Sequence, residues 1–172
     1  MMDVPLSLRA ELTYEDVEKL CAWTADPAVV RYLNEEAGTA DSLRSLLGRP
    51  ELPVLSPLFS RGGRFYMLDR GRASVGFVRF AGGFGPEAEL VVVIGERSLW
   101  GKGLGTMAVS LCLRKLFFEL RAERVTALIH PFNARSIGAF EANGFRQSLV
   151  KSSFPRYELT LEQYLLRSRR RA

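Results

Sequence analysis

The stretch "ERSLWGKGLGTMAV" (Glu96–Val109) places Gly101, Gly103 and Gly105 at alternate positions, between an apolar run and an amphipathic one. Because glycine has no side chain to obstruct a ligand, consecutive backbone N–H groups of such a loop can converge on an anion. A helix that begins at the end of the loop adds the positive end of its dipole at the same point. The stretch therefore predicts a phosphate-binding loop, with a plain glycine-rich turn as the simpler alternative.

Two common nucleotide-binding motifs fit this loop poorly. A P-loop requires G-x-x-x-x-G-K-[ST], but five residues separate Gly95 from the next glycine, and Gly103 stands where Ser or Thr must reach magnesium. The dinucleotide motif G-x-G-x-x-[GA] does match at Gly103, Gly105 and Ala108. However, the next predicted strand ends at His130, where that motif requires a carboxylate for the ribose. The loop therefore needs a different ligand.

Hydrophobic periodicity and capping signals predict the elements on both sides of the loop. Two helices are expected to open the chain. In order, the expected elements are a helix after Thr13, helices over 28–33 and around 41–47, strands over 64–68, 73–80 and 88–94, a helix over 105–120, a strand over 124–130, a helix over 134–143, strands near 145–151 and 156–159, and a last helix after Thr160. Only one crossover unit is present, so the pattern predicts a mixed sheet with helices on both faces.

Length and charge favour one domain. The chain has 172 residues, and we expect a single domain over residues 1–166 followed by a basic tail over 167–172. The net charge of +5 comes largely from the four arginines of that tail, so a solvated chain end is expected, with an RNA-binding tail as the alternative.

No apolar run is long enough to span a bilayer, and the N-terminus lacks the apolar core of a secretory signal, so a cytoplasmic location is expected. Cys21 and Cys112 lie in predicted helices as buried thiols, and His130 has no companions for a metal site.

The residues Trp100–Gly105 resemble the pyrophosphate loop [QR]-x-x-G-x-[GA] of the GNAT superfamily of acetyl-CoA-dependent N-acyltransferases, with Trp100 in place of Gln or Arg. "DPAVVRYL" (26–33) and "NARSIGAFEANGF" (133–145) resemble other segments of the branch that contains ribosomal-protein alanine and spermidine acetyltransferases. The resemblance covers most of the chain and is weakest over 34–60. It implies an α/β (α+β) fold with a mostly antiparallel sheet, splayed at its centre.

The resemblance also implies acetyl-CoA as acyl donor, no metal, and a set of ligand residues. The pantetheine arm would pair with the strand around Val92 and Ile94, and the helix start after the next strand would contribute Asn133 and Ser136. Helix capping is the alternative role of those last two residues. The diphosphate would be held by the loop residues, of which Lys102 is expected to lie at the periphery: Trp100, Gly101, Lys102, Gly103, Leu104, Gly105 and Thr106.

The sequence offers candidates for two catalytic groups, the proton donor to the leaving thiolate and the general base. Phe140 stands where the family often has the tyrosine that protonates the leaving thiolate, so water, Tyr66 or unassisted departure must replace it. Glu89 is the candidate general base, with a surface ion pair as its alternative role. Deprotonation at pH 7 costs about 4.6 kcal/mol for a lysine or polyamine nitrogen but about 1.4 kcal/mol for an α-amine. A site without a conspicuous base therefore favours an α-amine slightly.

We thus expect an N-acetyltransferase in which an amine, either a protein N-terminus or a small amine, attacks the thioester directly. An aminoglycoside acetyltransferase is one alternative, because "GKGLGT" also resembles that group, and its cationic substrates would need carboxylates. The candidates for these are Glu35, Glu36, Glu87 and Glu89. The other alternative is a non-catalytic acyl-CoA sensor. A monomer or homodimer is expected, without nucleic acid or membrane partners.

Overall fold

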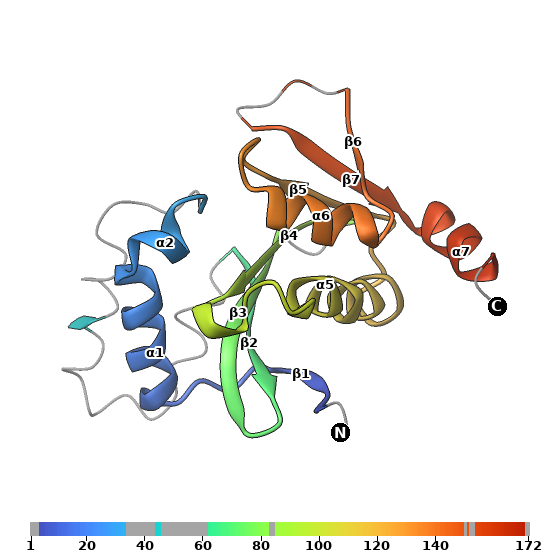
Figure 1. Cartoon of the computed structure of the whole chain (residues 1–172). Coiled ribbons are helices and arrows are strands. Elements are labelled where there is room, and N and C mark those ends of the chain that lie inside the picture. Colours follow the sequence, from blue (N-terminus) through green and yellow to red (C-terminus); the bar gives the residue numbers. More distant parts are fainter. Residues whose placement is uncertain are drawn as a thin grey trace.

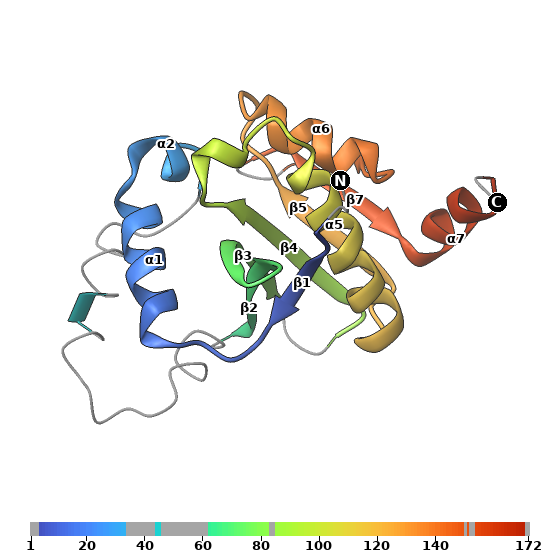
Figure 2. The same ribbon diagram turned by 60° about the horizontal axis from the view of Figure 1, so that its bottom comes forward.

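The computed structural model describes residues 4–33, 44–45, 62–82, 85–149, 151 and 154–170. The described part forms one seven-stranded sheet in the order β1-β2-β3-β4-β5-β7-β6, with helices on both faces (Figures 1 and 2). The strands are β1 (Leu6–Arg9), β2 (Gly63–Arg70), β3 (Ala73–Ala81), β4 (Glu87–Ile94), β5 (Arg124–Leu128), β6 (Arg146–Gln147) and β7 (Arg156–Thr160). The helices are α1 (Tyr14–Ala25), α2 (Pro27–Val30), α5 (Leu104–Arg114), α6 (Ala134–Ala142) and α7 (Leu161–Arg169), with a 3₁₀ turn η1 (Arg97–Leu99) and a π-helical turn η2 (Lys115–Glu119).

The sheet is splayed between β4 and β5. Every other pair of neighbouring strands is antiparallel, whereas β4 and β5 are parallel and pair only through Glu87, Ala88 and Glu89 of β4. Beyond Glu89, β4 continues to Ile94 beside β3 alone, while β5 stays paired with β7. The expected fold class, a mostly antiparallel sheet that opens at its centre, is confirmed.

Strand alternation divides the core between the two faces of the sheet. Phe65 and Met67 of β2 pack with the apolar side of α1, including Val17 and Leu20. The alternate residue Tyr66 packs on the opposite face with residues of α5 and η2. These two layers fix α1 and α5 on opposite sides of β4 (Figure 2).

Several sequence predictions need correction. The chain opens with the edge strand β1 and not with a helix, and β1 pairs antiparallel with β2. The unbroken β-branched run of β4 is typical of a strand buried on both faces, but Val91, Val92 and Ile94 are only half-buried, because β4 lacks a neighbour on its β5 side beyond Glu89. The predicted helix over 105–120 changes to π-helical pairing at Lys115. The strand predicted near 145–151 contains only the two residues of β6. Of the helix predicted around 41–47, only residues 44 and 45 are described, and both are helical.

The capping signals are confirmed. Thr13 and Asp16 form a capping box at α1, and Thr160 and Gln163 form another at α7. Asp26 caps α2, with Pro27 at its first position. Such motifs are predictable from the sequence because each needs only its own side chain and nearby backbone groups.

The basic residues after position 166 continue the helix α7. Helix α7 extends away from the other helices (Figure 1) and runs past the predicted boundary at residue 166, to Arg169. Within it, Arg167 donates a hydrogen bond to the carbonyl oxygen of Ala142, the last residue of α6. A cation at this position also interacts favourably with the negative end of the α6 dipole.

Candidate functional site

A cleft of about 380 Å³ lies at the splayed end of the sheet, between α2, β4, α5 and α6. All the sequence-predicted ligand residues except Lys102 line it, namely Val92, Ile94, Trp100, Gly101, Gly103, Leu104, Gly105, Thr106, Asn133 and Ser136. Lys102 is exposed on the loop outside the lining, as expected for a peripheral charge. The structure thus gathers three separate sequence segments around one cavity.

One wall of the cleft is an open strand edge. Gly95 N–H, directly after β4, donates to Val75 C=O at 2.9 Å. Because hydrogen-bonded residues alternate along an antiparallel pair, the odd-numbered residues of β4 direct their N–H and C=O groups toward β3. Val92 and Ile94 therefore direct theirs toward the opposite side, where no strand of the described residues pairs with β4 beyond Glu89. This edge can accept an extended ligand as an additional strand.

The loop ends in a helix N-terminus with free donors. Gly103 is the N-cap of α5, has φ of +77°, and offers no side chain to the first turn. The first helical bond of that turn joins Met107 N–H to Gly103 C=O. The N–H groups of Leu104, Gly105 and Thr106 therefore have no partner within the helix, and all three residues line the cleft. This arrangement suits an anion.

Two glycines of the loop have backbone conformations that favour glycine over other residues. Gly101 and Gly103 have φ of +74° and +77°, a region that L-residues with side chains adopt only with strain. A Cβ atom at either position would meet no protein atom within 4 Å, so the loop is not crowded. Gly105 has an ordinary helical φ, and a Cβ there would lie 3.6 Å from that of Ala139.

Two tryptophan side chains hold the first part of the loop. The indole Nε1 of Trp100 donates to the carbonyl oxygen of Ile94, 2.7 Å away. From α1, Trp23 Nε1 donates to the Glu96 carboxylate at 3.2 Å, and its ring packs so closely on Gly95 that no Cβ would fit there. The loop is therefore positioned by α1 as well as by β4.

Helix α6 supplies the opposite wall. Asn133 caps this helix, its Oδ1 accepting from Ser136 N–H at 3.3 Å, so the capping role of Asn133 is confirmed. Both residues also line the cleft. Phe140 lies in the same wall, is 2% exposed and packs edge-to-face against Phe145 at 4.9 Å. Its ring contributes no proton donor to the cleft.

The two sequence-predicted catalytic residues do not line the cleft. Glu89 is half-buried in the paired part of β4, in register with Thr126 of β5. Tyr66 is 7% exposed and lies in the core, its ring 5.2 Å from that of Phe80. The structure therefore does not bring Tyr66 to the position of a thiolate donor.

Sequence reasoning missed three residues that shape the site. Asn143 Nδ2 donates to Thr106 C=O at 3.0 Å and to Ala139 C=O at 2.8 Å, which ties the first turn of α5 to α6. Tyr32, which follows α2, and Arg135 both line the cleft. Tyr32 and Arg135 belong to the segments "DPAVVRYL" and "NARSIGAFEANGF", and their position in these segments was the available signal.

The cleft lining contains no carboxylate among the residues that the structure describes. Of the four glutamates considered for cationic substrates, Glu87 forms an ion pair with Arg156, and Glu35 and Glu36 lie outside the described residues. No group of three or more metal-ligating side chains occurs in the described ranges. No helix in the described part is long and apolar enough to cross a membrane.

Comparison with known proteins gives one family match and many structural matches. Residues 6–146 match the family model described as acetyltransferase (GNAT) domain. No curated protein matches the chain significantly. A domain from Methanocaldococcus jannaschii is 25% identical with a TM-score of 0.70, over 91% of this chain and 98% of the other. A GNAT-family acetyltransferase from Bacillus anthracis is 20% identical with a TM-score of 0.70, over 94% and 98%.

The aminoglycoside acetyltransferase AAC(6')-Ib has also been solved, in complex with coenzyme A and kanamycin. It is 20% identical with a TM-score of 0.72, and the match covers 97% of this chain and 99% of that one. At this identity the likeness concerns the fold.

Proposed function

We propose that this chain, which belongs to the acetyltransferase (GNAT) domain family and is an acetyl-CoA-dependent N-acyltransferase, acts on primary amines. The acceptor is either a protein N-terminus or a small amine, and the transferred group is acetyl. The observation that carries the proposal is that the open edge of β4 and the uncapped N-terminus of α5 face the same cleft. The first suits the amide-rich pantetheine arm and the second suits the diphosphate.

We assign the binding roles as follows. Backbone N–H groups from Gly101 to Thr106 hold the diphosphate, and Val92 and Ile94 pair with the pantetheine arm. Asn133 and Ser136 bind that arm from α6. The Ile94 carbonyl already accepts from Trp100, so the Val92 carbonyl and the Ile94 N–H group are the free groups that pair with the arm. Acetyl-CoA supplies, when bound, the activated acetyl group and a thiolate leaving group.

We propose direct attack. The amine nitrogen forms a bond to the thioester carbonyl carbon, the carbon–sulfur bond breaks, and the nitrogen loses a proton. The N–H group of Val92 points into the gap and is available to polarise the thioester carbonyl. No acyl-enzyme is expected on a cysteine, because burial raises the pKa of the Cys112 thiol to about 12 and also raises that of Cys21.

Proton transfer then depends on groups outside the lining. Glu89 remains our candidate base, and because it does not line the cleft, it would act through a water molecule. Phe140 cannot protonate the thiolate, so water or unassisted departure takes that role. Glu89→Gln should lower kcat, with Glu87→Gln as the matched control.

The experiment that tests the function is thiol release from acetyl-CoA, followed with a panel of amines, N-terminal peptides and aminoglycosides. We expect turnover with at least one α-amine and saturable binding of coenzyme A by calorimetry. Tight coenzyme A binding without turnover on the whole panel would contradict the proposal and favour an acyl-CoA sensor. Turnover restricted to aminoglycosides would assign the alternative substrate class.

A further inference from the structure

A second hollow of about 270 Å³ adjoins the cleft between α2 and the start of α6. It shares Tyr32, Trp100, Asn133 and Arg135 with the cleft and adds Arg31 and Phe132. We call it the arginine hollow. Because the two cavities share these walls, a ligand that extends from the cleft enters the hollow.

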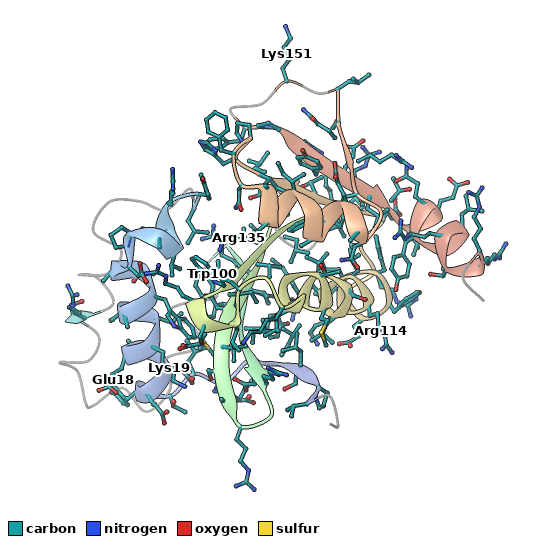
Figure 3. The ribbon with its side chains drawn as sticks, viewed as in Figure 1. Glu18, Lys19, Trp100, Arg114, Arg135 and Lys151 are labelled. Atoms are coloured by element: carbon teal, nitrogen blue, oxygen red, sulfur yellow. The ribbon has the colours of Figure 1, made fainter. Side chains whose placement is uncertain are left out.

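Both charged side chains of the arginine hollow are guanidinium groups that lie over aromatic rings. Arg135 Cζ lies 3.7 Å from the Trp100 ring centroid, and Figure 3 shows these two side chains side by side between α2 and α6. Arg31 Cζ lies 5.2 Å from the Tyr32 ring centroid. A stacked guanidinium keeps its N–H edge free for a planar or tetrahedral anion.

Neither arginine has a carboxylate partner in the described part of the chain, and no Asp or Glu lines the hollow there. Two guanidinium groups that face one cavity, with no carboxylate partner among the described residues, repel a cation and attract an anion. The charge of the hollow therefore selects against a substrate with several amino groups.

An apolar wall stands next to these charges. Phe132 is 79% exposed, and its ring lies 5.5 Å from that of His130. His130 also contacts the rings of Tyr32 at 5.0 Å and Phe154 at 5.6 Å. An exposed aromatic residue supported by other rings at a cavity mouth is typical of a ligand-binding surface.

We propose that the arginine hollow binds an anionic group of the acceptor, so that the acceptor is an amine that carries a carboxylate next to an apolar group. The proposal rests on the function proposed above and names its substrate class. Arg31 and Arg135 are then specificity-determining residues that bind the carboxylate, and Phe132 contacts the apolar part. Neither arginine takes part in bond making.

The test compares acceptors that differ only in the anion. L-Phenylalanine is paired with L-phenylalaninamide, and a peptide that begins Ala-Glu is paired with one that begins Ala-Gln. The ratio of kcat/KM within each pair is measured for the wild type, Arg31→Gln, Arg135→Gln and the control Arg72→Gln, an exposed arginine in the β2–β3 turn. The two acceptors of a pair differ in amine basicity, but this difference is the same whichever enzyme variant is used. A change in the ratio between wild type and variant is therefore caused by the substituted arginine.

We express the ratio as kcat/KM of the carboxylate acceptor divided by kcat/KM of its neutral partner. We expect Arg31→Gln and Arg135→Gln each to lower this ratio about tenfold for at least one pair, and Arg72→Gln to leave it unchanged. The pair that responds tells whether the carboxylate belongs to the amino acid itself or to the second residue of a peptide. Turnover of amines without any carboxylate preference, or with equal ratios in all variants, would overturn the inference and leave the proposed function standing. No turnover with any amine would overturn both.

A phosphate of the cofactor is the competing occupant of the arginine hollow. KM is therefore also measured for acetyl-CoA and for its 3′-dephospho analogue. We expect Arg31→Gln and Arg135→Gln to leave both values within about twofold of the wild type. A rise in KM for acetyl-CoA that is absent with the dephospho analogue would assign the hollow to the cofactor and refute the acceptor carboxylate.

Discussion

The indole Nε1 of Trp100 donates a hydrogen bond to the carbonyl oxygen of Ile94, 2.7 Å away, and this bond joins the glycine loop to the last residue of β4. Trp100 occupies the loop position where related loops carry Gln or Arg. The ring also stacks on Arg135 of α6. One side chain thus links the strand edge, the loop and the helix that surround the cleft.

Trp100→Phe should weaken cofactor binding more than it weakens the fold. The phenyl ring keeps a stacking surface for Arg135 but loses the bond to Ile94, which costs about 0.5–1.5 kcal/mol of unfolding free energy. Because that bond fixes the loop, we expect a larger loss in coenzyme A affinity, measured by calorimetry. Phe118→Tyr, on the exposed surface of η2, serves as the control. An unchanged affinity would show that the loop is positioned without the indole.

Two glycine substitutions should act in opposite directions on stability. Gly105→Ala should raise the unfolding free energy by about 0.5–1 kcal/mol, because alanine is the better helix former and its methyl meets Ala139 at ordinary contact distance. Gly103→Ala should lower it by about 1–2 kcal/mol, because φ is +77°. Chemical denaturation measures both.

The same pair tests the anion site. Gly105→Ala leaves the N–H groups of the first turn in place, so coenzyme A affinity should remain within about threefold. Gly103→Ala redirects these donors. The loss in free energy of coenzyme A binding should therefore be larger than the loss in unfolding free energy. If Gly103→Ala bound coenzyme A as tightly as the wild type, the backbone donors could not be the diphosphate ligands.

Much of this arrangement could be predicted from the sequence because its signals are local. The loop glycines, the N-cap Asn133 and the strand run before Gly95 each encode their own conformation. The strand β1 could not be predicted, because only Leu6 and Leu8 alternate there, and its place depends on pairing with β2, far along the chain.

The position of Tyr66 illustrates a second limit. Alternation predicts that Phe65 and Tyr66 face opposite sides of β2, but it does not tell which side lies toward the cleft. That choice is made by the packing of α1 and α5 on the finished sheet. The aromatic cluster around His130 was missed for the same reason, since its rings come from segments about 100 residues apart.

Asp16 should make the fold sensitive to acid. Burial alone would raise its pKa, but hydrogen bonds from Arg9 and Thr13 outweigh this and lower the pKa from 3.8 to about 2. A lowered pKa in the folded state gives stability that is present above pH 4 and is lost as the pH falls toward 2. The contribution of this carboxylate is about 2 kcal/mol.

The measurement is urea denaturation between pH 5 and pH 2. The wild type should lose about 2 kcal/mol more over this range than Asp16→Asn does. Glu15→Gln, an exposed acid on the same helix, should show the wild-type dependence. Parallel curves for the wild type and Asp16→Asn would mean that the Arg9 network does not depend on the charge of Asp16.

The buried cysteines should be dispensable for catalysis. Burial raises the pKa of the Cys112 thiol to about 12, and Cys112 lies fully buried on the core-facing side of α5. Cys112→Ala should therefore retain kcat within about twofold while losing about 1 kcal/mol of stability to the smaller side chain. Initial-rate kinetics should give intersecting lines, as direct transfer requires. Parallel lines together with an inactive Cys112→Ala would indicate an acyl-enzyme instead.

Phe140→Tyr should increase kcat. Phe140 is 2% exposed in the wall of the cleft, and its ring is fixed by the edge-to-face contact with Phe145. A hydroxyl on this ring adds a proton donor to a cleft wall that has none at this position. A positioned acid contributes about 10²–10⁴-fold to a step that it protonates, so even a partial effect on the chemical step is measurable.

The increase is measured as kcat in single-turnover experiments, which separate chemistry from product release. Phe118→Tyr adds the same hydroxyl on the surface and should leave kcat unchanged. Thermal denaturation distinguishes a kinetic effect from a folding defect, since the new hydroxyl replaces a well-packed hydrogen atom. The prediction assumes that departure of the thiolate limits the chemical step. A stable Phe140→Tyr with wild-type single-turnover kinetics would contradict this assumption and would indicate that proton removal from the amine is the slower step.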